Sequence, residues 1–257
     1  MHSFNYFLRP IKIIEDSNIP SAAKIEYAEN YQRDFHLIKY KPNYPAVSHL
    51  VLHELTHLEL AEEARAVDEN QLFTSNQSNR SKFFYTFEND AAKLRKKGIP
   101  EEAITNYLSA IFEGLNSQIF NTPIDLFIED RIYLRFKELR PLQFLSLTKL
   151  IREGIEATTN KEIVLNAPKS IISKSKKLNL VNALHFRELF GVDMIMEFNP
   201  TRAELKEAEE LYKEFKEYRK DKAPGEEYEL IQHWGEDLKL DSYFQLIPES
   251  EHKQKGY

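Results

Sequence analysis

The sequence predicts an α+β fold that is mostly helical, in which a small N-terminal antiparallel sheet packs on one interior helix and a helical lobe follows. Two observations support this prediction. Partly alternating, β-prone residues are confined to about the first 42 of the 257 residues, whereas apolar residues recur at helical spacing through most of the remainder. The chain is 42% hydrophobic and 30% charged, which is ordinary for a globular protein long enough to bury a sizeable core.

The N-terminal sheet is predicted from two β-prone runs, residues 23–27 and 35–40. The polar segment 29–34 lies between them and is typical of a hairpin loop, so the two runs should pair as antiparallel strands. A proline-containing break then ends the second strand. A long helix is expected from there, at about residues 44–70.

Helices are predicted to dominate the rest of the chain. The Ser/Asn-rich stretch 73–82 predicts a surface loop, and Gly98, Pro123 and Pro141 are expected to separate consecutive helices. The predicted helices span about 83–97, 101–120, 123–140, 142–157, 177–190, 201–221 and 226–235. The other predicted segments are short strands at 163–165 and 194–198 and a disordered tail at 249–257.

The domain organisation follows from this order of elements. We expect an N-terminal part, residues 1–98, that holds the sheet and the interior helix. A helical lobe, residues 99–248, should supply the other side of any site. The two parts could equally form one continuous domain.

The charge balance and residue usage exclude several kinds of site and partner. With 35 Lys and Arg against 41 Asp and Glu, the net charge is −6, which does not favour nucleic acid as a partner. The chain has no cysteine, so a metal site must use His, Asp or Glu. No long apolar run and no export leader is recognisable, so we expect no membrane partner and a cytoplasmic location. The oligomeric state stays open.

The most informative motif is HExxH, formed by His53, Glu54 and His57. Residues four apart lie on one face of a helix, so both imidazoles can bind one metal ion. Glu54 is rotated by about 100° and would lie beside the metal, where a general base for a metal-bound water is needed. The surrounding helix is apolar over most of its circumference, and buried histidines without partners would be costly. A metal ion would supply those partners.

With this motif on a helix that follows a hairpin, the chain resembles the zincin metallopeptidases. The resemblance covers about twenty residues around the motif firmly and residues 20–140 loosely. It implies a zinc-dependent peptidase with a peptide or protein substrate. It also implies that the strand before the helix, nearest to residues 35–40 here, is a sheet edge that binds the substrate backbone. A third protein ligand and one open position for water are further expectations.

Three carboxylates could complete the metal site. Glu63, six residues after His57, lies about 240° around the helix from it, so we reject it. Glu113 shares its helix face with polar residues and belongs to a solvated surface. Glu129 lies within an apolar stripe, where a carboxylate is costly unless it is paired or binds a metal. We therefore predict that His53, His57 and Glu129 hold Zn²⁺.

Four further residues are assigned supporting roles. Asp125, one turn before the predicted Glu ligand, could accept the second ring N–H of a ligand histidine or simply cap its helix. His49, one turn before the HExxH motif, should line the site. Tyr133 could donate to a developing oxyanion or pack as a core aromatic residue. His185 could be a transition-state hydrogen-bond donor or a structural histidine.

Zinc-dependent hydrolysis of peptide bonds is the function that these residues predict. Glu54 would take a proton from the metal-bound water and return it to the leaving amine. The alternative is a catalytically inactive zincin-like domain with a binding or regulatory role, because no substrate-specific motif is present. A helical interaction protein with a chance HExxH is the third hypothesis.

Overall fold

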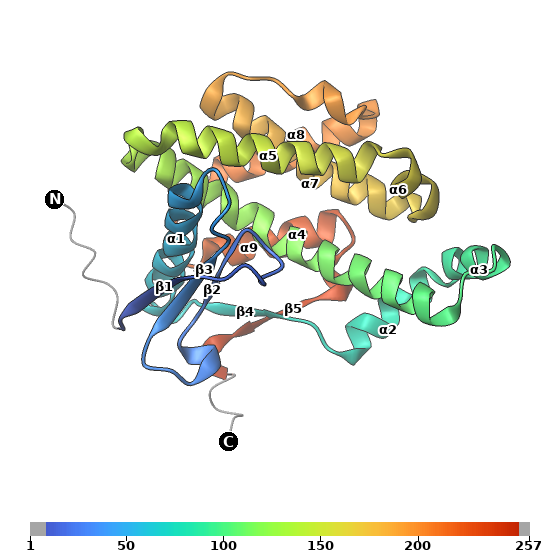
Figure 1. Cartoon of the computed structure of the whole chain (residues 1–257), viewed down its shortest axis with the longest axis horizontal. Helices are drawn as coiled ribbons and strands as arrows, with labels where there is room; N and C mark the ends of the chain where they lie inside the picture. Colours follow the sequence, from blue (N-terminus) through green and yellow to red (C-terminus); the bar gives the residue numbers. More distant parts are fainter. Residues whose placement is uncertain (1–8, 252–257) are drawn as a thin grey trace. The chain divides into compact units, whose positions relative to one another are not determined.

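The structure is a computed structural model that describes residues 9–251, and it is mostly helical with two small sheets (Figure 1). It confirms the predicted α+β, mostly helical class. The helices are α1 (Val47–Arg65), α2 (Gln77–Thr86), α3 (Glu88–Lys96), α4 (Glu101–Arg135), α5 (Arg140–Thr159), α6 (Lys161–Asn166), α7 (Lys169–Phe190), α8 (Arg202–Tyr218) and α9 (Glu226–Asp237). The strands are β1 (Ile11–Glu15), β2 (Ala23–Glu26), β3 (His36–Tyr40), β4 (Gln71–Thr74) and β5 (Gln245–Pro248). The short 3-10 helices are η1 (Glu29–Tyr31), η2 (Lys137–Leu139), η3 (Ile195–Phe198) and η4 (Asp241–Tyr243).

Two predictions from the sequence concern the ends of the chain, which the structure describes only in part. The first eight residues, where no export leader was expected, lie outside the described residues. The part of the predicted disordered tail after residue 251 also lies outside them. Residues 249–251, which belong to the same predicted tail, are helical and directly follow β5.

The N-terminal sheet has the strand order β1–β3–β2. The predicted hairpin is confirmed, because β2 pairs antiparallel with β3 and sets Ile25 opposite Ile38. The prediction of a wholly antiparallel sheet is wrong, because β1 runs parallel to β3. It pairs with the side of β3 away from β2 and sets Ile13 opposite Ile38. The predicted substrate-binding edge is also wrong: both hydrogen-bonding sides of β3 are occupied by neighbouring strands, so it offers no open edge.

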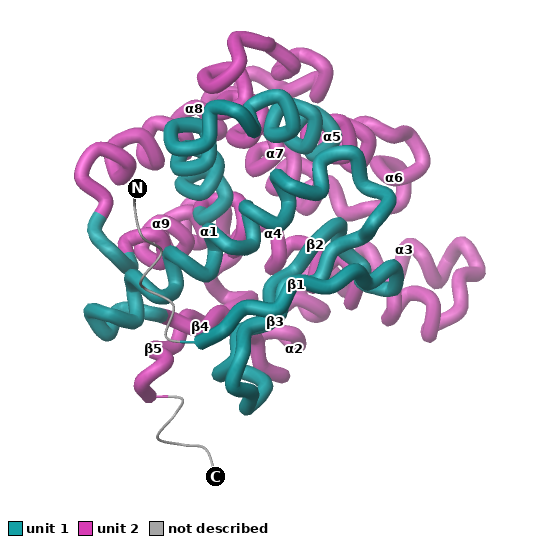
Figure 2. Tube along the Cα trace, turned by 60° about the vertical axis from the view of Figure 1, so that its left-hand side comes forward, with its two compact units in different colours: residues 1–70, 124–150, 223–225 teal, residues 71–123, 151–222, 226–257 magenta. Residues whose placement is uncertain are grey.

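The chain folds into two compact units, each assembled from separated segments (Figure 2). Unit 1 contains residues 1–70, 124–150 and 223–225, and unit 2 contains the remainder. The predicted division near residue 98 therefore falls inside a unit 2 segment, residues 71–123. α4 contributes its N-terminal part to unit 2 and its C-terminal part to unit 1.

In unit 1, α1 packs against β2 and β3 (Figure 1). The core there includes Ile38 from the sheet, Leu58 from α1, and Ile128 and Ile132 from α4, none of them exposed. Arginines at the end of α4 pair with acidic residues of α1, which holds the two helices together beside this core. The HExxH helix is thus fixed between a sheet and a second helix.

In unit 2, α7 packs against α8, and β4 pairs with β5 as an antiparallel ribbon. The largest buried side chains of this unit are aromatic and include Trp234, Phe83 and Phe186. A capping box begins α8, since the Thr201 hydroxyl accepts from the Glu204 backbone N–H while the Glu204 carboxylate accepts from the Thr201 N–H. β4 and the start of α2 occupy much of the stretch predicted as a surface loop.

Three further local predictions differ from the structure. Pro123 was expected to begin a helix but lies inside α4, where a proline removes one backbone hydrogen bond. The helix continues because the residues around Pro123, such as Ile119 and Ile124, are buried. The predicted strands at 163–165 and 194–198 are helical, in α6 and η3. Asn160 caps α6 by accepting from two backbone N–H groups, which outweighs the β propensity of the run.

Within residues 9–251, no helix combines the length and the apolar composition that crossing a bilayer requires.

Candidate metal centre

Three histidines of α1 and two carboxylates of α4 meet in unit 1. The histidines are four residues apart and so are the carboxylates, which places each set on one helix face. We call this group the α1–α4 cluster; its members are His49, His53, His57, Asp125 and Glu129. Imidazole and carboxylate alternate along it, from His49 through Glu129, His53 and Asp125 to His57.

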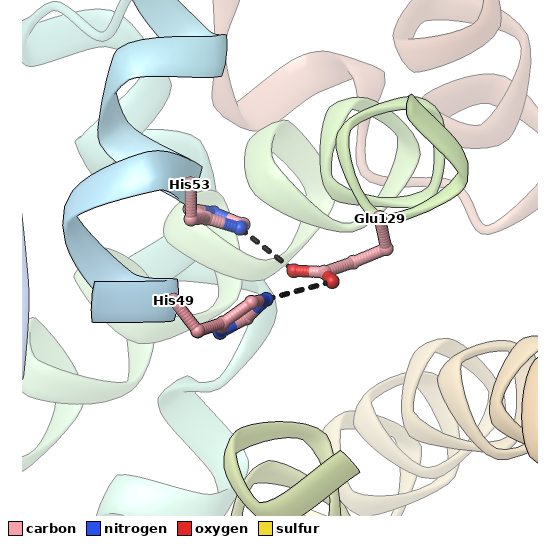
Figure 3. A group of neighbouring side chains, drawn as sticks. All are labelled: His49, His53 and Glu129. Carbon is pink, nitrogen blue, oxygen red and sulfur yellow. Dashed lines mark hydrogen bonds and ion pairs between the residues drawn. The ribbon is translucent and has the colours of Figure 1, made fainter. Parts of the chain in front are cut away.

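The inner end of the cluster is organised by Glu129 (Figure 3). Its Oε1 lies 2.8 Å from His53 Nδ1, and its Oε2 lies 3.0 Å from His49 Nε2. Gln143 of α5 donates its amide N–H groups to Glu129 Oε2 at 2.6 Å and to the Glu129 main-chain oxygen at 2.9 Å. Glu129 is only 3% exposed. This buried carboxylate is therefore fully occupied by hydrogen-bond donors.

The outer end consists of His53 Nε2, His57 Nε2 and Asp125 Oδ1. The two nitrogens are 3.2 Å apart, and the oxygen lies 3.3 Å from His53 Nε2 and 3.2 Å from His57 Nε2. The three side chains are 13% to 23% exposed, more than the 3% of Glu129, although the Asp125 Oδ1 atom itself is buried. Asp125 Oδ1 forms no hydrogen bond of acceptable geometry within the described residues despite these short separations.

This triangle has the dimensions of one face of a metal tetrahedron. Zinc–nitrogen and zinc–oxygen bonds of about 2.0–2.2 Å place the ligand atoms of a tetrahedral site about 3.3–3.6 Å apart. The two imidazole nitrogens also form a hydrogen bond with each other, whereas Asp125 Oδ1 forms none, and the near-equal separations fit three ligand atoms around one ion. Two imidazoles and one carboxylate are also a donor set that zinc accepts.

Electrostatics in the cluster reflect the two carboxylates. Burial lowers the pKa of His53, but Asp125 and Glu129 outweigh it, so that pKa lies well above its ordinary value. Burial raises the pKa of Glu129, but His49 and His53 outweigh it and hold that pKa well below its usual range. The pKa of Asp125 is likewise lowered: the facing imidazoles of His53 and His57 outweigh burial. Both carboxylates are thus kept ionised for cation binding or hydrogen bonding.

The structure arranges the two carboxylates differently from the prediction that Glu129 is the third ligand and Asp125 the orienting group. Asp125 faces the Nε2 atoms of His53 and His57, whereas Glu129 lies on the Nδ1 side of His53. Among the described residues, His53 and His57 form a three-residue group of close ligand atoms with Asp125 and not with Glu129. Helical periodicity identified the more buried carboxylate, Glu129, whereas the Asp125 side chain lies at the more exposed end of the cluster. The geometry thus favours exchanging the two roles.

Glu54 lies on α1 between the two HExxH histidines and is half-buried. Within the described residues its carboxylate forms no hydrogen bond or ion pair, in contrast to the neighbouring Glu59, Glu62 and Glu63. Its role as a general base stays a prediction.

Two other predicted site residues have different neighbours. The Arg140 guanidinium lies 3.8 Å from the centre of the Tyr133 ring, and Arg140 donates to the Tyr133 main-chain oxygen. His185 is buried in unit 2, with its Nδ1 atom 3.2 Å from the Tyr212 hydroxyl and its ring edge against Phe215. These contacts suit packing roles, and a catalytic role of either residue stays a prediction.

Gln143 is the site residue that the sequence did not reveal. It is fully buried on α5, whereas the apolar Leu145 and Leu150 of the same helix are 48% and 40% exposed. Hydrophobic periodicity therefore points to the wrong face of this segment. The one available signal was a polar side chain two residues after Pro141, which is weak because helix N-termini are commonly polar.

A third group of possible ligands, Glu29, His36 and Glu62, lies elsewhere in unit 1. Arg65 pairs with both carboxylates, and His36 Nδ1 accepts the backbone N–H of Ala28 at 3.2 Å. Each of the three side chains thus has a protein partner, although Glu29 Oε2 itself accepts no hydrogen bond, and the group forms an ion-pair network.

Comparison with protein-family models, curated proteins and solved structures found no match to this chain. The chemistry of the α1–α4 cluster is therefore the basis for inferring a function. Its position on two helices of one unit, with an accessible outer end, makes it the strongest candidate site in the described part of the chain.

Proposed function

We propose that this protein is a zinc-dependent hydrolase that cleaves peptide bonds, with His53 Nε2, His57 Nε2 and Asp125 Oδ1 as the metal ligands. The observation that carries the proposal is the triangle of these three atoms, with sides of 3.2 to 3.3 Å. Three protein ligands leave the fourth position of a tetrahedral site open, as hydrolysis requires. When bound, zinc would acidify a water molecule and polarise the substrate carbonyl.

The protein's own residues then have distinct tasks. His53 and His57 present lone pairs from one helix face, and Asp125 adds a negative charge that offsets part of the charge of the cation. Glu54 accepts the proton of the attacking water and returns it to the nitrogen of the leaving amine. A carboxylate without competing hydrogen bonds in the described chain suits that transfer.

The first experiment asks which residues bind the metal. Protein purified without added zinc should contain one zinc ion per chain by elemental mass spectrometry. His57→Ala and Asp125→Ala should lose the zinc, whereas Glu129→Gln should retain it in excess zinc because it removes no ligand. Retention by Asp125→Ala together with loss by Glu129→Gln would show that the original assignment of Glu129 is right and ours is wrong.

The second experiment asks whether the centre is catalytic. Glu54→Gln should keep its zinc and lose roughly 10²- to 10⁴-fold in the rate of cleavage of a fluorogenic peptide library. Glu113→Gln, an exposed change on α4, is the matched control and should keep the full rate. Undiminished hydrolysis by Glu54→Gln would refute the mechanism. Stoichiometric zinc without cleavage of any library peptide would instead favour a binding or regulatory domain.

A further inference from the structure

We infer that Gln143 and His49 are positioning residues, which act through Glu129 to hold His53 in the tautomer and orientation that a metal ligand needs. This inference rests on the proposed metal centre and deepens it, since neither residue contacts the outer triangle. It assigns a function to a buried hydrogen-bond chain that links α5, α4 and α1 within unit 1. Figure 3 shows the part of this chain between Glu129 and the two histidines.

The first step concerns the tautomer of His53. An ionised carboxylate only accepts hydrogen bonds, so the contact of 2.8 Å between Glu129 Oε1 and His53 Nδ1 requires the hydrogen to be on Nδ1. In the neutral ring the other nitrogen, Nε2, then carries a lone pair. That lone pair faces His57 Nε2 and Asp125 Oδ1. Glu129 thus selects the form of His53 that can bind a metal.

The second step concerns what holds Glu129. His49 and Gln143 both donate to Oε2, which leaves Oε1 for His53. The Gln143 amide also donates to the main-chain oxygen of the same glutamate, so it fixes both the backbone and the side chain of that residue. Gln143 and His49 are 0% and 1% exposed. Water therefore cannot replace these donors without a change in packing, and hydrogen bonds in such an environment are strong.

An alternative for the same atoms is a second metal ion, held by His49, Glu129 and the Nδ1 atom of His53. The contacts argue against it. Both Glu129 oxygens already accept hydrogen bonds of 2.6 to 3.0 Å. A metal there would displace Gln143 from Oε2 and would have little access to solvent.

The test compares variants that remove one donor each. Gln143→Met and His49→Phe remove the donors at similar volume, and His49→Gln keeps an N–H group. The matched control is Asn116→Leu, which removes a buried amide donor of α4 whose partner is the Tyr243 main-chain oxygen. Zinc affinity is measured by competition with a chromophoric chelator, the ligand geometry by the visible spectrum of the cobalt-substituted protein, and stability by thermal unfolding.

We expect zinc to bind about 10- to 100-fold more weakly to Gln143→Met and to His49→Phe, with an altered cobalt spectrum. His49→Gln should recover most of the affinity, and the control should lose stability without a change in affinity or spectrum. If Gln143→Met and His49→Phe lose stability as the control does but keep the wild-type affinity and spectrum, their role is only structural and the inference is overturned. Two zinc ions per chain, with the second lost in His49→Phe, would also overturn it.

A measurement without metal separates this inference from the proposed function. In the metal-free wild-type protein at alkaline pH, ¹⁵N NMR should show neutral His53 with its hydrogen on Nδ1, and Gln143→Met should lose that preference. A hydrogen on Nε2 in the wild type would overturn the inference. The expected tautomer in a protein that binds no zinc would support the orienting role and would refute the metal-dependent function alone.

Discussion

At the scale of single residues, the environment of each carboxylate decides what it can do. Glu129 and Asp125 are one helical turn apart on α4, and each faces two imidazoles. Glu129 is buried among three donor side chains, whereas Asp125 keeps one oxygen without a hydrogen bond in the described chain. The same residue chemistry thus yields a structural anchor in one place and a candidate ligand in the other.

Glu26 provides a prediction about pH at this scale. Burial raises its pKa, but hydrogen bonds and charges from Lys24, Lys39 and Arg33 outweigh it and lower the pKa from 4.5 to about 2. A carboxyl group whose pKa is lower in the folded than in the unfolded state stabilises the fold at pH values above its unfolded-state pKa. This stabilisation is lost as the pH falls toward the folded-state pKa. Between pH 4.5 and about 2, the free energy of unfolding should therefore decrease by about 1 to 3 kcal/mol through this residue.

The check is urea unfolding of metal-free protein over that pH range. Glu26→Gln should be less stable at neutral pH and should lose this part of the pH dependence. Glu113→Gln serves as the control, because its side chain is 69% exposed, and it should keep the wild-type dependence. A wild-type slope in Glu26→Gln would contradict the assignment.

At the scale of elements, the α1–α4 cluster depends on how α1 is held against α4. Beyond the histidines, Arg131 forms a bidentate pair with Glu63 at 2.8 and 2.9 Å and contacts Glu59 at 3.0 Å. Arg135 contacts Glu59 at 2.8 Å. Bidentate, partly buried arginine–carboxylate pairs are geometrically specific, so they help to set the register of the two helices.

Replacing Arg131 tests this link. Arg131→Met should lower the free energy of unfolding by about 1 to 2 kcal/mol, because it leaves half-buried carboxylates with fewer partners. Chemical denaturation of the metal-free protein measures the effect. Arg152→Met, an exposed change on α5 without an ion pair in the described chain, should alter stability little. Equal stability of the two variants would show that the Arg131 pairs do not hold the helices.

At the scale of the whole molecule, unit 1 is assembled from segments that are far apart in the sequence. The three histidines belong to residues 1–70, whereas both carboxylates and Gln143 belong to residues 124–150. A metal bound to His53, His57 and Asp125 would cross-link these two segments. Because the unfolded chain does not hold the ligands together, binding should stabilise the folded state.

Thermal unfolding with and without zinc tests this coupling. Free zinc at 1,000 times its dissociation constant should stabilise the protein by about 4 kcal/mol and raise Tm, and excess chelator should reverse the shift. His57→Ala should show no such response. A Tm that zinc does not change, in wild-type protein that demonstrably binds it, would mean that the ion does not bridge the two segments.

The elements that follow local rules were predicted well, and those that depend on distant partners were not. The β2–β3 hairpin and the helix that begins at about residue 201 are local, and both are confirmed. The β4 strand was missed because its partner, β5, lies near the other end of the described chain. The continuation of α4 through Pro123 was missed because packing of the flanking residues outweighs the local cost of a proline.

The sequence by itself determined that His53, Glu54 and His57 share a helix and that the carboxylate of Glu129, in a later helix, is buried. Spacing along one chain segment suffices for both, because the helical repeat sets which residues share a face. Only the tertiary structure decided which carboxylate meets which ring nitrogen and that Gln143 takes part. Those contacts depend on the register of α1 against α4 and on the position of α5, and helical periodicity contains no information about either.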